Sequence, residues 1–370
     1  MSAARQMVCV MFVTVLIGCG APASAQTPPT EGSTAQLAQV SSAARPEPSS
    51  YDTLWLKFTQ WYKNDSNPVV QQVLFSGRYQ HEFAALDAGQ VRHDEWNVRR
   101  MRLGPRITLF HKVTLHAEVE VNPQERDPFY MRFTDAYVQW NKSSRVVMTV
   151  GKQGVPFTID GATSSKELLT IDRSSLSNNL WFPQEYMPGV SVSGRVSPWV
   201  YRAGIYSSGA MNREFGEFNG GRFTLGLLGY DFASRLGVKE AVLTGNYVYQ
   251  VPDSRNTFTR QLEHVTSLHF KLESNRWGLR ADVSDGRGYF GQSDVRAVMA
   301  MPFFNVTRKL QAVGRYTRID SATPNGIRFA TYESRVVAGR GICTTNSTPA
   351  RTTTSMDTSS SSRRACSGWT

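Results

Sequence analysis

Apolar and polar residues alternate with a period of two along most of the chain from residue 72 onward. In 97–110 one face is apolar and the other is rich in arginine: Met101, Leu103, Ile107 and Leu109 alternate with Arg100, Arg102, Arg106 and Thr108. The segments 112–121, 276–284 and 307–317 repeat the pattern. One apolar face at this period indicates half-buried β-strands. Taken alone, the pattern fits a soluble β-sandwich equally well.

The lengths of the connections separate these two architectures. Joins after even-numbered strands are short, as at His111 and Asn275, whereas joins after odd-numbered strands are long, with 153–187 the longest. An up-and-down membrane barrel is built in this way, with tight turns at one end and long loops at the other. The sequence therefore predicts an all-β fold, a transmembrane antiparallel up-and-down β-barrel spanning 72–339. Fourteen strands are readable, near 72–84, 96–110, 112–121, 131–140, 145–152, 188–197, 199–206, 221–232, 239–250, 263–274, 276–284, 294–304, 307–317 and 327–338.

The composition favours a membrane barrel over a helical membrane protein. The chain has 370 residues, and its mean hydropathy is −0.35. After the first 30 residues no stretch approaches the roughly 18 consecutive apolar residues of a spanning helix, whereas a barrel strand exposes only alternate residues to lipid. Aromatic residues make up 11% and lie mostly near predicted strand ends, where interfacial girdles sit. The net charge of +11 favours an anionic partner such as nucleic acid, anionic lipid or a small anion.

The N-terminus has the features of a secretory signal. Arg5 precedes a short apolar run, and Ala23-Ser24-Ala25 is a small-residue cleavage site, so residues 1–25 are predicted to be removed. A lipobox-like sequence that ends at Cys19 competes with this interpretation, since it would lipidate that cysteine. Residues 26–50 are rich in Pro, Ser, Ala and Gln and are predicted to be a disordered linker. Residues 51–71 form a pre-barrel segment without a clear pattern.

Sequence motifs for chemistry are absent from the main body of the chain. There is no cysteine from residue 26 to 341, and the six histidines have no metal-ligand spacing, so neither a metal nor a cofactor is expected. The GxGxxG sequence at 286–291 follows a predicted strand, but no helix follows it, so we interpret it as a loop. No catalytic residues are predicted.

Several runs resemble the phosphate-selective porins O and P. They are Phe75-Ser76-Gly77-Arg78, 98–104, 134–140, and Gly151-Lys152-Gln153 through Pro156-Phe157 with 163–174 after it. The resemblance covers roughly 73–339. It implies a sixteen-stranded barrel in the outer membrane, usually trimeric, that passes phosphate or related small anions. It also implies that the loop after the fifth strand, here 153–187, folds into the lumen.

If the apolar faces point to lipid, a set of basic residues points inward. Rings or ladders of arginine and lysine select anions, and the arginine fork suits phosphate. The predicted lumen-facing residues are Arg100, Arg102, Arg106, Lys112, Arg145, Lys271, Arg276, Arg280, Lys309 and Arg315. On the inserted loop, Lys166 and Arg173 are the candidates for the constriction, or alternatively for salt bridges that hold the loop to the wall.

Three functional hypotheses follow from the sequence. The first is an anion-selective porin that binds no nucleic acid, with phosphate as a candidate anion. The second is an outer-membrane barrel whose loops carry an enzymatic or adhesive function. The third is a soluble periplasmic β-protein that is anchored through Cys19. Single-channel current separates the first from the second, and detergent dependence separates both from the third.

The tail from 340 to 370 departs from the barrel pattern. About half of its residues from Ile342 onward are serine or threonine, without alternation, which indicates biased sequence that does not belong to the barrel. Because the family resemblance implies two more strands, we predict a frameshift near codons 340–342; the alternative is a genuine fourteen-stranded barrel with a disordered tail. Translation of the same DNA in the other two frames should reveal two alternating, aromatic-rich segments. If neither frame contains them, there is no frameshift.

Overall fold

The computed structural model describes residues 9–18, 57–87, 92–124, 127–165, 167–180, 186–208, 221–256, 259–307, 310–323, 326–329, 343–353, 356–359 and 362–364. In 9–18 and from 343 onward it describes the backbone alone. Within these ranges, no helix is both long and apolar enough to cross a membrane.

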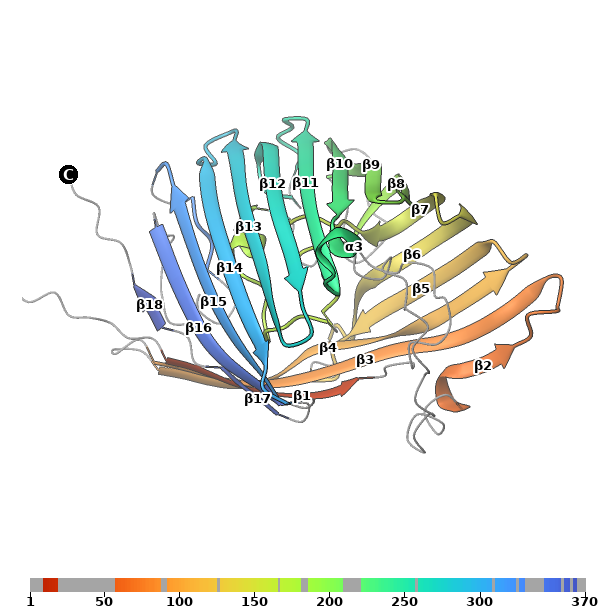
Figure 1. The fold of residues 1–370 in the computed structure, drawn as a ribbon, viewed down its shortest axis with the longest axis horizontal. Coiled ribbons are helices and arrows are strands. Elements are labelled where there is room, and N and C mark those ends of the chain that lie inside the picture. The colour runs from red at the N-terminus through yellow and green to blue at the C-terminus, as the bar shows by residue number, and fades with distance from the viewer. Residues whose placement is uncertain are drawn as a thin grey trace, which may run out of the picture.

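Antiparallel strands, each paired with its neighbour in sequence, form one large curved sheet (Figure 1). The strands are β2 (Gln60–Lys63), β3 (Val70–Asp87), β4 (Arg92–Leu109), β5 (Val113–Val121), β6 (Tyr130–Ser143), β7 (Val146–Gly154), β8 (Tyr186–Val196), β9 (Trp199–Ser207), β10 (Arg222–Asp231), β11 (Glu240–Gln250), β12 (Leu262–Glu273), β13 (Trp277–Gly288), β14 (Val295–Asn305), β15 (Leu310–Ser321) and β16 (Cys343–Thr353). Two short helices interrupt them, α2 (Ser175–Leu180) and α3 (Ala233–Leu236).

The predicted fold class is confirmed, because β3 to β16 form an up-and-down antiparallel sheet of 14 strands. Strands β3 to β15 correspond to the first thirteen predicted strands. The last predicted strand, 327–338, lies mostly outside the described residues. The sheet is not closed on itself: in the described part of the chain β3 does not pair with β16.

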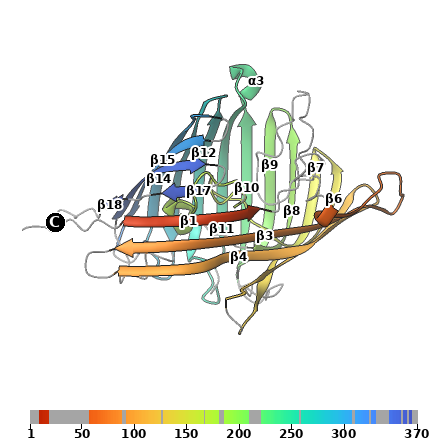
Figure 2. The same ribbon diagram turned by 90° about the horizontal axis from the view of Figure 1, so that it is seen from below.

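Both chain ends contribute strands that the sequence did not predict. Residues of the predicted signal form β1 (Cys9–Gly18), which pairs along its whole length with β3 (Figure 2). In the tail, β16 pairs with β15, and β17 (Met356–Ser359) pairs with both β16 and β1; β18 (Ser362–Arg364) pairs with β16. Threonine is β-branched and favours extended conformation, and the tail is rich in threonine. This accounts for strands in the tail, although its apolar and polar residues do not alternate.

The first hairpin is longer than predicted. Both β3 and β4 have 18 residues, so the loop predicted at 85–95 is largely strand. Cross-strand aromatic contacts extend the pairing, since the Trp96 ring lies 4.8 Å from that of Phe83 and 5.3 Å from that of His81.

At the opposite end of the hairpin the chain turns tightly from β4 to β5. Phe110 and His111 both have positive φ angles, 51° and 58°, and Lys112 N donates to Leu109 O over 3.1 Å. Two central residues with positive φ match the twist of the flanking strands. His111 N also donates to Gln71 Oε1 over 2.7 Å. The short connection is therefore fixed by local hydrogen bonds.

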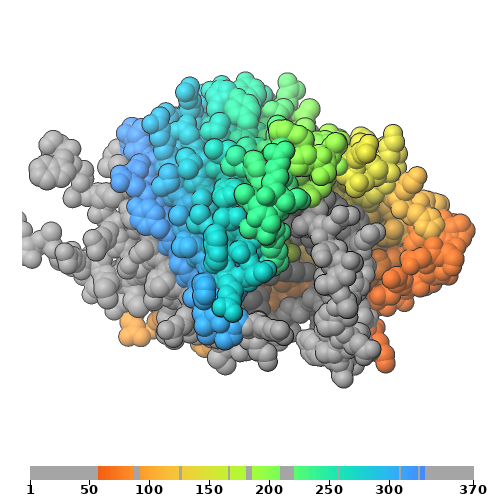
Figure 3. All heavy atoms as spheres, in the orientation of Figure 1, coloured from red at the N-terminus to blue at the C-terminus, as the bar shows by residue number. Residues whose placement is uncertain are grey.

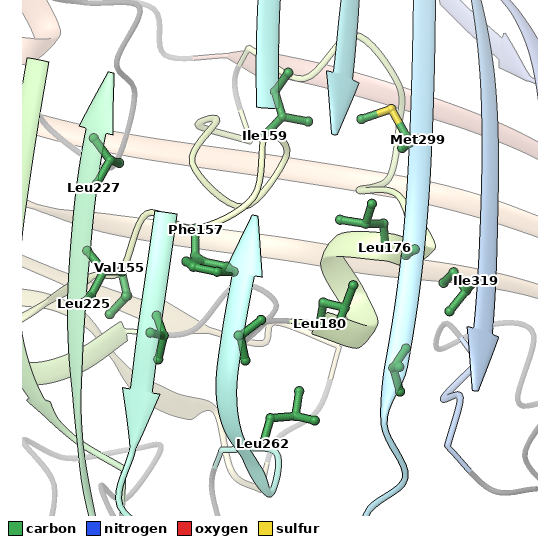
Figure 4. Packing of buried hydrophobic residues seen from close by; sticks show 14 of the residues in the cluster. Val155, Phe157, Ile159, Leu176, Leu180, Leu225, Leu227, Leu262, Met299 and Ile319 are labelled. Atoms are coloured by element: carbon green, nitrogen blue, oxygen red, sulfur yellow. The ribbon is translucent and has the colours of Figure 1, made fainter. Parts of the chain in front are cut away.

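The largest apolar cluster lies inside the sheet. Val155, Phe157 and Ile159, together with Leu176 and Leu180 of α2, pack on inward-facing residues of the later strands (Figure 4). These wall residues include Phe223, Leu225, Leu227, Val265, Val295, Met299 and Ile319. The residues between them on β10 face outward, as Leu228 does, and are exposed. The wall from β10 to β15 is thus apolar on both faces for part of its height, because the inserted segment covers its inner face.

Truncation of this cluster should destabilise the folded protein. Phe157 is fully buried, so we expect Phe157→Ala to lower the free energy of unfolding by about 3–5 kcal/mol. Phe129→Ala is the matched control, since Phe129 is 53% exposed and should change the free energy by less than about 1 kcal/mol. Guanidinium-induced unfolding of the protein in detergent micelles measures the free energy of unfolding of both variants. Equal effects would show that the segment does not pack on the wall in solution.

The alternation of connection lengths also predicts which end of the sheet faces the cell exterior. We expect 153–187, 207–220 and 251–262 to be lumenal or extracellular and 141–144 and 233–238 to be periplasmic. Ser144 and Arg255 are both exposed. With Cys343 and Cys366 replaced by serine, Arg255→Cys should react with a membrane-impermeant maleimide on intact cells, and Ser144→Cys should react only after lysis. The reverse result would invert the topology.

Candidate functional site

The connection between β7 and β8 has a charged side opposite the apolar side that packs on the wall. Its polar residues contact both ends of the row of strands. Arg78 of β3 donates from Nη1 to Ser165 Oγ, and Arg315 of β15 donates from Nη1 to Thr170 Oγ1 over 2.7 Å. Ile159 N donates to Asp282 Oδ2 of β13 over 2.7 Å. The segment therefore lies on the inner, concave side of the sheet, where it contacts both the first strands and the last.

A β-bulge in β4 turns an additional arginine inward. Gln80 pairs with Arg100 and His81 pairs with Val98, so Arg99 has no partner position on β3. On a regular strand Arg99 and Arg100 would face opposite sides, and a lipid-facing arginine costs about 2–4 kcal/mol at the bilayer midplane. At a β-bulge, two consecutive residues can direct their side chains toward the same face of the sheet. Arg99 consequently reaches two carboxylates, Glu82 at 2.9 Å and Asp172 at 2.6 Å.

Asp172 is the central residue of this contact. Its Oδ1 accepts from Arg99 Nη2 and from the Arg173 backbone N–H, while its carbonyl accepts from Arg315 Nη1 over 2.6 Å. Burial alone would raise the pKa of the Asp172 carboxyl, but the charges of Arg99, Arg100 and Arg315 outweigh it and hold the pKa below its ordinary value of 3.8. Asp172 is therefore ionised at neutral pH. We call Arg99, Asp172 and Arg315 the loop latch.

A second group of charges lies next to the latch on β4 to β6. Arg102 donates from Nε to Glu120 Oε1 over 2.9 Å, and Arg132 donates to Glu120 Oε2 over 2.6 Å. Arg102 Nη1 also donates to Tyr186 Oη over 2.5 Å. Arg100 donates to the neutral Gln80 side chain over 2.8 Å. The latch, Arg78, Arg100, Arg102 and Arg173 lie within electrostatic range of one another, and we call these residues the arginine cluster.

Arg100 and Arg315 give the cluster its excess positive charge. In the described part of the chain their hydrogen-bond partners are neutral oxygens, and no carboxylate there forms an ion pair with either guanidinium. Arg100 is 3% exposed. A guanidinium held by neutral groups in a low-dielectric site keeps its attraction for a passing anion.

The structure places the predicted basic residues in three groups. Arg100, Arg102 and Arg315 meet in the arginine cluster, and Arg106 follows them on the same face of β4. Lys271 and Arg280 are directly opposite each other on the inner faces of β12 and β13. Lys112, Arg145 and Arg276 lie in exposed tight turns, so their prediction as wall residues is corrected: each strand ends or begins one residue away from them. Lys166 and Lys309 lie outside the described residues.

Arg173 occupies the inserted loop as predicted, but it contacts the loop itself. It donates from Nε to Asp160 O over 2.8 Å and from Nη2 to Thr163 O over 3.0 Å. Burial lowers the pKa of this guanidinium, partly compensated by Tyr186, Asp160 and Asp172. Both of these contacts are made to carbonyl oxygens of the inserted loop, so Arg173 forms no salt bridge with the wall through them. The salt bridge between loop and wall is formed by Asp172 with Arg99.

Sequence reasoning missed Arg78, Arg99, Asp172 and Tyr186. A signal existed for Arg99, because Arg99, Arg100 and Arg102 cannot all face one side of a regular strand, so a bulge or an exposed charge is required. No local signal marks Asp172, whose role depends on contacts with residues 73 and 143 positions away. Among the described residues no group of His, Cys, Asp and Glu has the geometry of a metal site.

Comparison with known proteins gives the context for this geometry. The family model for phosphate-selective porin O and P matches residues 73–290, more than half of the chain. No curated protein sequence matches significantly. Among solved structures, Salmonella typhi OmpF in complex with daunomycin aligns with a TM-score of 0.54 at 10% identity, covering 82% of this chain and 98% of that one.

Two further solved structures are similar at lower scores. The outer-membrane channel DcaP of Acinetobacter baumannii has a TM-score of 0.47 at 10% identity, covering 97% of this chain and 94% of that one. The anion-selective porin from Comamonas acidovorans has a TM-score of 0.43 at 12% identity, covering 79% and 98%. Family and fold together indicate a channel rather than an enzyme. The chain belongs to the phosphate-selective porin O and P family and is an outer-membrane porin.

Proposed function

We propose that this porin is selective for small anions and that the arginine cluster is its selectivity site. The observation that carries the proposal is the excess of guanidinium over carboxylate where the inserted loop meets the wall. Arg100 and Arg315 hold neutral oxygens, while Glu82, Glu120 and Asp172 each balance other arginines. A passing cation is repelled there and a passing anion is attracted.

Phosphate is the anion that the chemistry of the cluster fits best. Arginine presents paired N–H donors at a spacing that matches two oxygens of a phosphate. The Tyr186 hydroxyl, which accepts from Arg102, supplies a neighbouring polar group. Lys271 and Arg280 extend the positive wall toward the short-turn end, since they lie near the last residue of β12 and the first of β13. These further positive charges would attract the anion onward, so that an anion bound at the arginine cluster can leave it.

Current through planar bilayers tests this function directly. Under a potassium chloride gradient, the reversal potential should have the sign of an anion-selective channel. Replacing chloride by phosphate should lower the conductance in a saturable manner at millimolar phosphate, since a bound anion occupies the site. A reversal potential with the sign of a cation channel would overturn the proposal, as would a conductance for phosphate that never saturates.

We propose further that the protein is exported by its N-terminal signal and works as a homotrimer. The support is the family membership together with the signal-like residues 1–25. Chemical cross-linking in membranes followed by denaturing electrophoresis should give a band at three times the chain mass. N-terminal sequencing of the purified protein should begin at Gln26, in which case the mature protein lacks β1. A blocked, lipid-modified Cys19 would show that the protein is a lipoprotein.

A further inference from the structure

A belt of exposed aromatic residues follows the short-turn end of the sheet from β4 to β14. Each of them lies close to a short turn and is between 42% and 56% exposed. The residues of this belt, which we call the short-turn belt, are Phe110, Trp140, Trp199, Trp277 and Phe304. On a membrane-spanning sheet, exposed aromatic residues at the strand ends lie at the boundary between lipid headgroups and hydrocarbon.

The pre-barrel segment extends this belt past the first strand. Strand β3, all of which the structure describes, has no exposed aromatic residue of its own. Its outward residues near the short-turn end are covered instead, because the Trp61 ring stacks on that of Phe75 with centroids 5.0 Å apart and an angle of 8° between the planes. The covering segment in turn exposes Phe58 and Trp61, by 64% and 62%. It thus presents the aromatic surface that β3 lacks.

A β-bulge and one hydrogen bond fix Trp61 in this position. The residues on either side of Trp61 pair with consecutive residues of β3, so Trp61 itself has no partner position. Its indole Nε1 donates to Phe58 O over 3.0 Å. Because the polar atom of the ring already has a partner within the segment, the indole can leave water without losing a hydrogen bond.

The segment is also tied to the short-turn end of the sheet. Phe110 N donates to Val69 O over 2.9 Å, and His111 N donates to Gln71 Oε1 over 2.7 Å. The connection from β2 to β3 therefore lies beside the tight turn from β4 to β5. In Figure 3 the orange atoms of the first strands form one margin of the molecule, and β2 lies there beside β3 (Figure 1).

Aromatic surface rather than net charge selects the partner of this segment. The exposed charged residues of the segment and its connection are Lys57, Lys63 and Asp65, so both signs occur. A second protein chain would cover only one part of the circumference of the sheet. The short-turn belt runs across most of that circumference, and the segment continues it. The lipid that surrounds the belt is therefore the partner that also meets Phe58 and Trp61.

We infer that residues 57–63 are an interfacial membrane anchor on the outside of the barrel. Phe58 and Trp61 insert between phospholipids of the leaflet at the short-turn end, at the boundary of headgroups and acyl chains. The pairing of β2 with β3 also covers part of the edge of β3, and open edges are not tolerated in hydrocarbon. The inference does not depend on which anions pass through the pore.

Spin labelling in bilayers of phosphatidylcholine tests the anchor at Phe58. With Cys343 and Cys366 replaced by serine, a nitroxide on Phe58→Cys is offered oxygen, which concentrates in hydrocarbon, and a neutral nickel chelate, which stays in water. The label should collide with oxygen at least about threefold more often than with the chelate, as should a label on Leu228→Cys of the outer wall. A label on Asp65→Cys, in the exposed connection, should show the reverse preference.

The two other results of this measurement overturn the inference. A preference for the chelate at position 58 would place the segment in water. Low collision rates with both probes would mean that a second protein chain covers it.

Replacing Trp61 shows whether the stacked ring holds the anchor in place. In Trp61→Ser the stacking on Phe75 and the hydrogen bond to Phe58 are lost, so the oxygen-to-chelate ratio of the label should fall at least about threefold. Phe290→Ser is the matched control and should leave the ratio unchanged, since Phe290 is also 62% exposed but follows β13 at the long-loop end. Heat-modifiable migration confirms that each variant is folded. An unchanged ratio in Trp61→Ser would overturn the assignment of Trp61 to the anchor.

Discussion

Replacing Arg100 and Arg102 together with glutamine should reduce the anion-over-cation permeability ratio by about tenfold at low salt. One charge at about 4 Å contributes roughly 1 kcal/mol even in a dielectric like water, and about 1 kcal/mol corresponds to a factor of about five in the distribution of an ion. Both guanidinium groups belong to the arginine cluster and are almost fully buried, so their charge acts on a passing ion from behind the lumen surface rather than by direct contact. The effect should shrink as the salt concentration rises, because the Debye length falls to about 10 Å at 0.1 M.

A variant with the same charge change elsewhere is the control for this experiment. Arg235→Gln together with Arg276→Gln removes two positive charges from exposed turns at the short-turn end. The permeability ratio of that control should stay within about twofold of the wild type. The reversal potential under a potassium chloride gradient measures both. Equal shifts in the two variants would mean that the net charge of the protein, rather than the cluster, sets the selectivity.

Loss of the loop latch should convert a steady channel into a fluctuating one. Asp172→Asn removes the carboxylate that accepts from Arg99 and from the Arg173 backbone. A hydrogen bond to a charged group is worth about 1.5–3 kcal/mol, so the population with a displaced loop should rise by roughly 10-fold or more. Recordings of single channels at neutral pH should show frequent transitions between conductance levels.

Acid should produce the same change in the wild type. The pKa of Asp172 is lowered in the folded protein, so the latch contributes its full stability above the ordinary value of 3.8 and loses it as the pH falls through the lowered value. Between pH 7 and pH 5 the wild type should be unaffected. Once the pH falls below that lowered pKa, the wild type should fluctuate as Asp172→Asn does at pH 7, while acidification of Asp172→Asn itself should add little.

Asp253 offers a matched carboxylate that makes no contact with the loop latch in the described residues. Hydrogen bonds from Arg255 lower its pKa to about 2, yet the pair lies in an exposed connection. Asp253→Asn should therefore leave both the current at pH 7 and its acid response unchanged. If Asp253→Asn fluctuates as much as Asp172→Asn, or if Asp172→Asn is as steady as the wild type, the latch does not hold the loop.

The sequence by itself determined the strands and the direction of most side chains. Apolar residues that alternate with polar ones indicate strands that turn one face away from water. The alternation of short and long connections then indicates an up-and-down arrangement of those strands. Arg100, Arg102, Lys271, Arg280 and Arg315 were therefore assigned to the inner face before their neighbours were known. Such assignments depend on a residue and its immediate sequence neighbours, which is why they can be made from sequence.

The tertiary structure decided what those inner residues contact. The bulge at Arg99 changes the direction of one side chain by interrupting the register with β3, and register is a property of two strands rather than one. The packing of Phe157 and Leu176 on an apolar inner wall likewise required the inserted segment and the later strands together. Asp172 joins β4 to β15 across most of the length of the chain. A contact between distant segments is set by the free energy of the whole fold, so no local pattern around Asp172 could have marked it as the residue that holds the loop in place.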